Sequence, residues 1–329
     1  MTATPASADA SDEIFVALAA YREPELGLTI ESCVEHATHP ERLRFGVCQQ
    51  WDDTIPGAEF DCLDSLRERW PIRRVRFHHH ESRGGCWARH LTQGLYDGEP
   101  YTLQIDAHSR LASGWDTELI GAIGALPGDR PLLTGSPPLY VRPDGVDELL
   151  DPADDPVPVT VVEQWSDAGW IHHPLVPAPA GAPCEPRPTR VLSGGFVFTT
   201  GAWNVDVRQD PEHLYAGEEF ALTLRSYTHG YDLWNPARRV VWHRGHPAPN
   251  PKYISDDPDG AVGRRRDRAS RRLRTLLAGD PARVLEPYSL GTARSLEEYS
   301  AWSGLDVATR RIHPDARLGV DPPRPAAAR

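Results

Sequence analysis

The sequence LQIDAHSR at residues 103–110 places an acid, a one-residue spacer and a histidine directly after a short apolar run. The apolar residues predict a strand over 101–106, with a turn after Arg110. In an open α/β sheet, ligands bind just beyond the carboxyl ends of strands, so Asp106 and His108 can both face one divalent ion. A carboxylate oxygen and an imidazole nitrogen suit Mn²⁺ or a similar cation. The alternative is an ordinary turn after a strand, where Asp is common.

Strands and helices alternate around this stretch. The predicted strands cover 14–19, 43–48, 72–78 and 101–106, and the predicted helices cover 26–37 and 85–96. This alternation predicts an α/β fold with a mostly parallel, doubly wound central sheet flanked by helices. No GxGxxG follows the first strand and no P-loop pattern occurs, which excludes the usual dinucleotide and P-loop phosphate sites.

Composition and charge argue against several classes of protein, such as nucleic-acid-binding, secreted and membrane-spanning proteins. The chain has 329 residues and a net charge of -12, which argues against a nucleic-acid partner. Residues 1–12 lack the apolar region of a signal peptide, and no apolar run approaches the roughly 20 residues of a membrane span. The five cysteines follow no CxxC spacing and are expected to be reduced thiols. We therefore expect a cytoplasmic protein without a membrane partner; its Arg-rich, Pro-rich composition favours a GC-rich, bacterial genome.

The rest of the chain predicts one catalytic domain with a helical extension. The sheet is expected to continue over 131–140, 191–198 and 240–243, with a helix over 218–229. The domain then covers 13–260, with a nucleotide-binding half at 13–115 and an acceptor half at 191–260. The proline-rich stretch 142–190 is too long for an ordinary connection and is expected to be a lid or an acceptor-binding region.

The C-terminal part is expected to be helical over 261–313, and residues 1–12 and 314–329 are expected to be disordered. A helix at 262–277 carries seven arginines, which we interpret as a solvated helix that pairs with an acidic body. Ser295 followed by Glu298 predicts a capping box that opens a last helix.

Ordered motifs in both halves resemble one family. They are CWAR at 86–89, LYDGEPY at 95–101, LQIDAH at 103–108, GWD at 114–116, GEE at 217–219, THGYD at 228–232, VWHR at 241–244 and GTARSL at 291–296, with Arg225 between them. Over roughly residues 14–305 the chain resembles the GlcNAc-transferase family, whose best-known members attach GlcNAc to hydroxyproline in a ubiquitin-ligase adaptor. It is more distantly similar to the mucin-type polypeptide GalNAc-transferases. The resemblance implies a GT-A (Rossmann-like) glycosyltransferase fold.

The resemblance also implies a metal site. Asp106 and His108 are then the first two ligands and His243 is the third, for Mn²⁺ or Mg²⁺ that neutralises charge on a departing diphosphate. Ala107 stands where the family usually has a serine, but the spacer should point away from the ion.

His229 is the second choice for the third ligand. The run at 78–80 consists of three histidines, which we expect not to converge on one ion because strand side chains alternate between faces.

Donor contacts are expected at the ends of the first strands. Asp52 and Asp53 can bind a ribose hydroxyl or the uracil, although a plain turn fits equally well. Arginines near the third strand can pair with the diphosphate, and Arg89 is preferred to Arg83. The predicted donor-binding set is Tyr21, Arg22, Glu23, Asp52, Asp53, Arg83, Arg89, Gln104 and Asp106.

Catalytic and acceptor residues are expected in the second half. Adjacent helical positions point about 100° apart, so one of Glu218 and Glu219 should face the substrates, and we choose Glu218. Helix capping is the alternative for both. Asp116 is expected to bind acceptor or sugar hydroxyls. Three residues complete the predicted acceptor surface: Trp115, Gly194 and Gly195. For Trp115 we favour a position in the core over a role as an apolar platform for the substrate.

Three functions are compatible with these patterns. The first is a metal-dependent glycosyltransferase that moves a sugar, GlcNAc by resemblance and with retention, from a UDP-sugar to a hydroxyl of a protein, peptide or small-molecule acceptor. The second is a nucleotidyltransferase or sugar-nucleotide hydrolase, which would normally show a glycine-rich or lysine-containing phosphate loop. The third is a non-catalytic sugar-nucleotide or peptide-binding module derived from a transferase.

Overall fold

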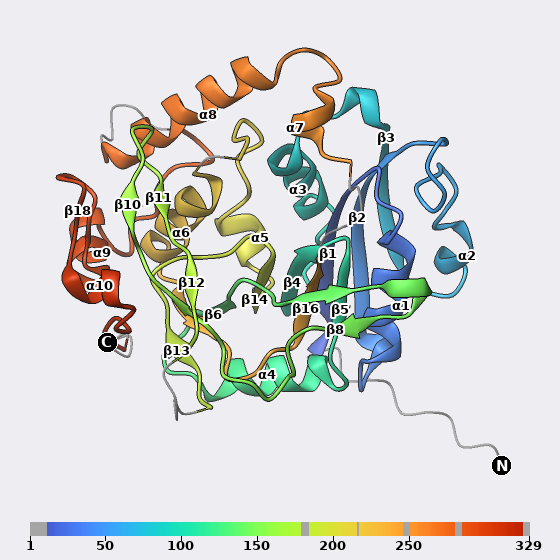
Figure 1. Cartoon of the computed structure of the whole chain (residues 1–329), viewed down its shortest axis with the longest axis horizontal. Coiled ribbons are helices and arrows are strands. Elements are labelled where there is room, and N and C mark those ends of the chain that lie inside the picture. Colours follow the sequence, from blue (N-terminus) through green and yellow to red (C-terminus); the bar gives the residue numbers. More distant parts are fainter. Residues whose placement is uncertain (1–11, 179–183, 216, 246–250, 280–284, 325–329) are drawn as a thin grey trace.

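The computed structural model describes residues 12–178, 184–215, 217–245, 251–279 and 285–324 (Figure 1). Within this part of the chain, the main sheet holds eight strands in the order β13-β15-β6-β14-β4-β1-β2-β3. Its strands are β1 (Ile14–Tyr21), β2 (Leu43–Trp51), β3 (Ile72–His78), β4 (Tyr101–Asp106), β6 (Pro131–Thr134), β13 (Arg187–Pro188), β14 (Phe196–Thr200) and β15 (Asp232–Asn235). Strands β3, β2, β1 and β4 are parallel, as predicted, and β14 runs antiparallel to β4.

Strand bounds follow the sequence pattern closely in the first half and less well in the second. The strands predicted at 72–78 and 101–106 are confirmed, and β1 and β2 run slightly further than expected. The predicted stretch 131–140 divides into β6 and β7 (Leu139–Val141), which lies in another sheet. Two consecutive prolines separate them, and proline cannot donate to a strand ladder. The strand predicted at 191–198 begins only at Phe196.

Helices cover both faces of the main sheet. Alternate residues of β1, such as Val16 and Leu18, belong to a core cluster that includes Trp115 of α4. Phe15 points the other way, and α3 packs against β1 on that face. Figure 1 shows α4 on the opposite side of the sheet from α3. The helices of this part are α1 (Leu26–Glu35), α2 (Asp64–Arg67), α3 (Gly85–Gln93), α4 (Trp115–Ala125), α5 (Trp203–Asp206) and α6 (Glu218–Thr228).

A second, smaller sheet brings His243 beside the segment that follows β4. Its strands are ordered β5 (Ser109–Leu111), β16 (Val241–Arg244), β7 and β8 (Glu148–Leu149). Strand β16, predicted at 240–243 as part of the main sheet, pairs antiparallel with β5 instead. The segment directly after β4 therefore lies beside a strand from the far end of the domain.

The stretch 142–190 contains short strands. Strand β9 (Val159–Thr160) pairs with β12 (Leu175–Val176), and β10 (Gln164–Trp165) pairs with β11 (Ile171–His172). Val162 and Ile171 pack into a cluster with residues of α6 and the C-terminal helices. The predicted role as a lid or an acceptor-binding region stays a prediction.

The C-terminal part is helical, as expected, and also ordered beyond its predicted end. Helix α8 spans the predicted residues, and Arg272 Nε lies 2.6 Å from Asp210 Oδ2. Helix α10 corrects the expectation of disorder at 314–318, because Ala316 is buried and its carbonyl accepts a hydrogen bond of 2.9 Å from Val162 N–H. Residues 1–11 and 325–329, also expected to be disordered, lie outside the described residues. The remaining elements are α7 (Tyr253–Asp256), α8 (Val262–Leu277), α9 (Leu296–Ser303), β17 (Leu305–Asp306), β18 (Arg311–Ile312) and α10 (Pro314–Leu318).

Two further sequence expectations concern thiols and membranes. All five cysteines are free, as predicted. Among the described helices, none combines the length and the apolar character needed to cross a bilayer.

The structure confirms the core position favoured for Trp115, and it gives Asp116 partners within the fold, away from the pocket. Trp115 is fully buried in the core, and its indole N–H donates to the Cys33 carbonyl at 2.9 Å. Asp116 is also buried, and its carboxylate accepts the backbone N–H groups of Thr38 and His39, both at 2.8 Å. A small depression contains both Asp116 and Ile14, the first residue of β1. Both residues therefore serve the fold at the end of the sheet opposite to the carboxyl ends of the strands.

We predict that Asp116→Ala lowers the free energy of unfolding by roughly 2–3 kcal/mol, because it removes a charged acceptor from two backbone donors. Chemical denaturation of both proteins measures this change. Transfer activity per folded molecule should stay at the parent level. A variant of normal stability with impaired turnover would restore the predicted substrate role of Asp116.

Candidate active site

A pocket of about 290 Å³ opens beyond the carboxyl ends of β1 and β4. Its walls come from segments distant in sequence: the residues after β1 and β4, the start of α3, the start of α6, β16, and the chain leading into α7. The lining residues used below are Tyr21, Glu23, Cys86, Arg89, Asp106, His108, Glu218, His243, Arg244, Lys252 and Tyr253.

Asp106, His108 and His243 converge on this pocket. One ligand atom from each lies within 4.8 Å of the others. His243 Nε2 lies 2.8 Å from His108 Nε2 and 3.5 Å from Asp106 Oδ2. The pairing of β16 with β5 sets His243 opposite Ser109, the residue after His108. Ala107 is buried in the core and points away from the cluster, as predicted.

Glu23 supports His108 from behind. Its Oε2 lies 2.8 Å from His108 Nδ1. A carboxylate on the second nitrogen of an imidazole is the usual support of a histidine that binds metal, because it fixes the tautomer and the ring orientation. Burial lowers the pKa of His108, but the hydrogen bond to Glu23 and the charge of Asp106 outweigh this and raise it. One carboxylate, two imidazoles and a supporting acid together fit Mn²⁺.

Arg89 balances the charge of Asp106. Its Nη2 donates to Asp106 Oδ1 at 2.9 Å, and its Nη1 lies 3.9 Å from Glu218 Oε1. Burial raises the pKa of Asp106, but His243 and Arg89 outweigh this effect and hold that pKa well below its usual range. A Cβ on Gly194 would lie 2.6 Å from Arg89 Nη1, so glycine leaves the space that this arginine needs. A Cβ on Gly195 would lie 3.3 Å from Asp106 Oδ2.

The two adjacent acids at the start of α6 have different surroundings. Glu218 lines the pocket, and its Oε2 is a buried atom without a hydrogen-bond partner in the described structure. Burial raises the pKa of Glu218. Glu219 instead accepts the Gly194 N–H at 2.7 Å and thereby holds the loop beside Arg89. Of the two acids, Glu218 is the one placed to contact a ligand in the pocket.

Comparison with known protein families identifies the family of this chain. The profile of the family described as "Glycosyltransferase (GlcNAc)" matches residues 13–65 and 57–309. The chain belongs to the GlcNAc glycosyltransferase family. No curated protein matches it significantly by sequence.

Solved structures show that this family member has the GT-A fold. A crystal structure of GalNAc-T7 with UDP, GalNAc and Mn²⁺ is similar at a TM-score of 0.56 and 18% identity, and it covers 88% of this chain. The chain spans only about half (54%) of the GalNAc-T7 chain. Two structures of S. aureus TarS 1-349 also match, at a TM-score of 0.45 and 10% identity. One covers 70% of this chain and 60% of that chain; the other, in complex with UDP-GlcNAc, covers 72% and 59%.

A hydrogen-bonded group of side chains from the ends of β1 and β2 and from α7 lies beside the pocket of this GlcNAc-family protein, and of these residues Tyr21 lines it. Arg22 donates to Asp52 at 2.7 Å and to Asp256 of α7 at 2.6 Å, and the Tyr21 hydroxyl donates to Asp256 at 2.9 Å. Burial would raise the pKa of Asp52, but Thr54 and Arg22 lower it to about 2. Asp52 is therefore an anion fixed beside the pocket, and its contact with a donor stays a prediction.

Five residues of the predicted donor set do not line the pocket: Arg22 and Asp52, described above, and Asp53, Arg83 and Gln104. Asp53 is exposed and accepts the Phe60 N–H at 3.2 Å. Arg83 lines a neighbouring depression with Trp87. Gln104 is buried and donates to the Gly194 carbonyl at 3.0 Å. It therefore supports the loop that contains Gly194 and Gly195, which we call the glycine loop.

The other histidines are placed differently from the expectation. His229 Nδ1 lies 2.8 Å from the Arg225 carbonyl and belongs to no metal-capable group among the described residues. The run at 78–80 does form such a group, which corrects the prediction that these rings cannot converge.

The sequence analysis did not predict that the residues at the start of α7 line the pocket. Lys252 and Tyr253 line the pocket, and Asp256 joins Tyr21 and Arg22 beside it. One signal was present, because Lys252 is the only lysine in a chain rich in arginine. Cys86 and Arg244 also line the pocket, and they lie inside motifs that had been quoted without a role.

We predict that His243→Ala weakens Mn²⁺ binding by more than about 100-fold. Loss of a mere supporting partner costs roughly 10–100-fold in metal affinity, and loss of a ligand should cost more. Electron paramagnetic resonance titration of Mn²⁺ with UDP present measures the affinity. His229→Ala is the matched control and should bind like the parent; equal affinities for parent and His243→Ala would remove His243 from the ligand set.

Proposed function

We propose that this protein transfers a sugar from a UDP-sugar to a hydroxyl group in a metal-dependent reaction, with GlcNAc as the sugar. The supporting observation is the convergence of Asp106, His108 and His243 with Arg89 and Glu218 on one pocket of a GlcNAc-family GT-A fold. A binding module derived from a transferase would have no need to keep both the metal-capable trio and an acid with one carboxylate oxygen buried and not hydrogen-bonded.

The metal-capable trio is suited to the diphosphate end of the donor. Asp106, His108 and His243 would hold Mn²⁺ or Mg²⁺, which neutralises negative charge on the leaving diphosphate when bound. Arg89, Arg244 and Lys252 bring further positive charge to the same pocket. The chain thus offers the cation cluster that a departing nucleoside diphosphate needs.

The nucleoside end is assigned to the residues after the first two strands. Tyr21 lines the pocket, and Arg22 holds Asp52 as an anion beside it. A fixed carboxylate can accept a ribose hydroxyl or the imide N–H of uracil. Glu23 was predicted to join this contact, but its carboxylate is engaged by His108, so we assign it to metal support.

Glu218 is proposed to position a hydroxyl of the sugar or the acceptor. With retention by front-face attack, the bond from the anomeric carbon to the phosphate oxygen breaks as the bond to the acceptor oxygen forms. The acceptor proton passes to the leaving phosphate oxygen, so no protein base is required. The buried, unpartnered Oε2 of Glu218 is then available as a hydrogen-bond acceptor. The acceptor class is a hydroxyl-bearing peptide, protein or small metabolite in the cytoplasm.

The deciding experiment is UDP release by the purified protein from UDP-GlcNAc, UDP-GalNAc, UDP-glucose and UDP-galactose, with and without Mn²⁺. We expect slow, Mn²⁺-dependent release from UDP-GlcNAc in preference to the other three donors. Full turnover in excess EDTA would contradict the metal-dependent mechanism. Metal-dependent UDP binding without transfer to any acceptor in a hydroxyl-compound panel would favour the binding module.

Glu218→Gln should lower kcat by roughly 10–100-fold, the effect of weakening one charged hydrogen bond in the transition state. Mn²⁺ binding should stay within about twofold of the parent, because Glu218 is not a ligand. Steady-state kinetics with the preferred donor measures the effect, and Glu212→Gln, which alters an acid paired with Arg268 outside the pocket, is the control. An unchanged kcat would remove Glu218 from the reaction.

A further inference from the structure

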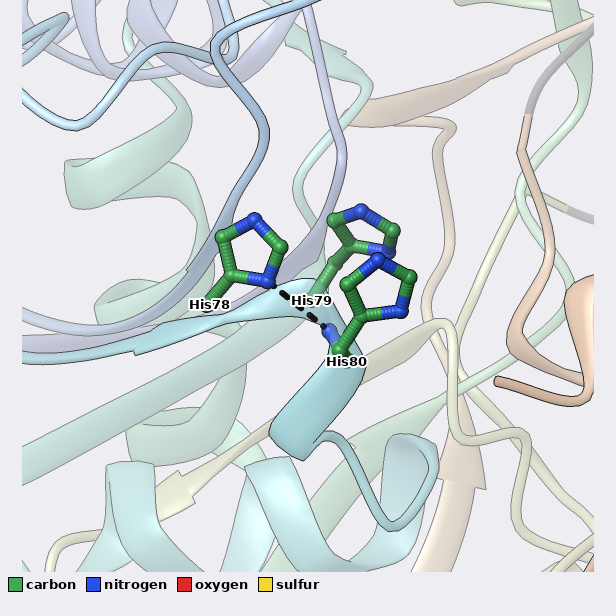
Figure 2. A group of neighbouring side chains, drawn as sticks. All are labelled: His78, His79 and His80. Carbon is green, nitrogen blue, oxygen red and sulfur yellow. Dashed lines mark hydrogen bonds between the residues drawn. The ribbon is translucent and has the colours of Figure 1, made fainter. Parts of the chain in front are cut away.

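The three consecutive histidines form a cluster at the end of β3. Figure 2 shows their rings side by side above the turn that follows the strand. Ring centroids are 4.6 Å apart for His78 and His79, 4.8 Å for His78 and His80, and 4.0 Å for His79 and His80. One nitrogen of each ring lies within 4.8 Å of the others.

The end of the strand explains why these side chains gather. His78 is the last residue of β3, and residues His79–Glu81 form a single 3-10 turn, η3. Alternation between faces therefore stops at His78. The turn is held by two hydrogen bonds: His80 N–H donates to His78 Nδ1 at 3.4 Å, and His78 N–H donates to Glu81 Oε1 at 3.0 Å. With Nδ1 of His78 accepting from the backbone, its Nε2 is the nitrogen left to bind a ligand.

His79 lies near a carboxylate and has one ring nitrogen without a hydrogen bond. Its Nε2 lies 3.8 Å from Asp52 Oδ2, which is an ion-pair separation beyond hydrogen-bond distance. Its Nδ1 is buried and makes no hydrogen bond within the described part of the chain. The contact with Asp52 is therefore looser than the hydrogen bond between Glu23 and His108, and Nδ1 is the nitrogen of His79 left for a ligand.

We propose that His78, His79 and His80 form a second metal site, for a late first-row divalent cation such as Zn²⁺ or Ni²⁺. Three neutral imidazoles suit these ions, whereas Mn²⁺ favours sites rich in oxygen ligands. Nitrogens on one tetrahedral Zn²⁺ at 2.0–2.1 Å are about 3.4 Å apart, so the rings must close slightly, and His80 is exposed and able to turn. Three protein ligands leave a position for water.

The site adjoins the nucleoside end of the pocket without sharing a ligand with the first cluster. Asp52 contacts both His79 and Arg22, and the Tyr21 ring packs edge-on against His79 at 6.3 Å. An ion at this position would fix the turn after β3 against the segment after β1. The inference concerns metal binding alone and stands whether or not the protein transfers sugar.

The test disables the trio of Asp106, His108 and His243, so that the three consecutive histidines are the metal-capable group that remains among the described residues. The full chain with Asp106→Ala and His243→Ala is freed of metal by chelator, dialysed against Zn²⁺, and its bound zinc is counted by elemental analysis. We expect one equivalent per chain, with three imidazole nitrogens in the X-ray absorption spectrum of the bound zinc. Adding His78→Gln, His79→Gln and His80→Gln should lower the zinc affinity at least 10-fold. His172→Gln, which alters an exposed histidine paired with Glu163, should leave it unchanged.

Folding controls keep the result decisive. Thermal unfolding without metal checks that the triple histidine variant is folded, and zinc should raise the midpoint of the background alone. If the triple variant is unstable, His80→Gln alone, at an exposed position, must still weaken zinc binding. Three results would overturn the proposal. The triple variant could still bind one equivalent of zinc, or the His172→Gln control could lose as much zinc affinity as the triple variant. The third is that the background binds Mn²⁺ as tightly as Zn²⁺.

Discussion

The antiparallel pairing of β16 with β5 is the constraint on which the candidate site depends. His108 and His243 lie 135 positions apart in sequence, yet the strand register sets His243 opposite Ser109. The same register sets Val241 opposite Leu111, and both of these side chains are buried in the core. The separation of the two imidazoles is therefore fixed by backbone hydrogen bonds and apolar packing. Ligands held in this way need little rearrangement to accept an ion.

Charge in the pocket depends on the shape of the glycine loop. A carboxylate removed from water, without a cation nearby, tends to take up a proton; His243 and Arg89 lower the pKa of Asp106 and keep it ionised. Arg89 has room beside Asp106 because Gly194 has no side chain, and Glu219 and Gln104 hold that loop in place. The anionic state of Asp106 thus depends in part on Gly194, a residue distant from it in sequence. A divalent ion on Asp106 would take over this neutralisation and free Arg89 for a diphosphate.

The sequence predicts those parts of the structure that depend on local pattern. The first four strands, helix α8 and the Ser295 cap follow from periodicity and capping chemistry. The ordered motifs also predict that Asp106, His108 and His243 come together, as the structure has them. Errors arise where tertiary contacts decide. Asp116 lies inside a family motif, but its carboxylate holds two backbone N–H groups. Helix α10 exists because Ala316 meets Val162 from a distant segment. The contribution of Asp256 depends on the fold of the chain leading into α7, for which the sequence has no periodic signal.

The histidines show why residue type alone does not define a metal site. His229 ends a helix with its Nδ1 facing the Arg225 carbonyl, and no acid supports it. His108 has a carboxylate hydrogen-bonded to its ring at 2.8 Å, whereas His79 has one nearby at 3.8 Å without a hydrogen bond. The two sets differ in charge, however, because Asp106 supplies an anionic oxygen to the first, whereas the second has imidazoles only and its nearby Asp52 is already paired with Arg22. An oxygen-preferring ion such as Mn²⁺ gains from the anionic ligand, and an ion that binds neutral nitrogen strongly does not require it. The different placement of the carboxylates therefore gives the two clusters different metal preferences, although both lie near the same end of the sheet.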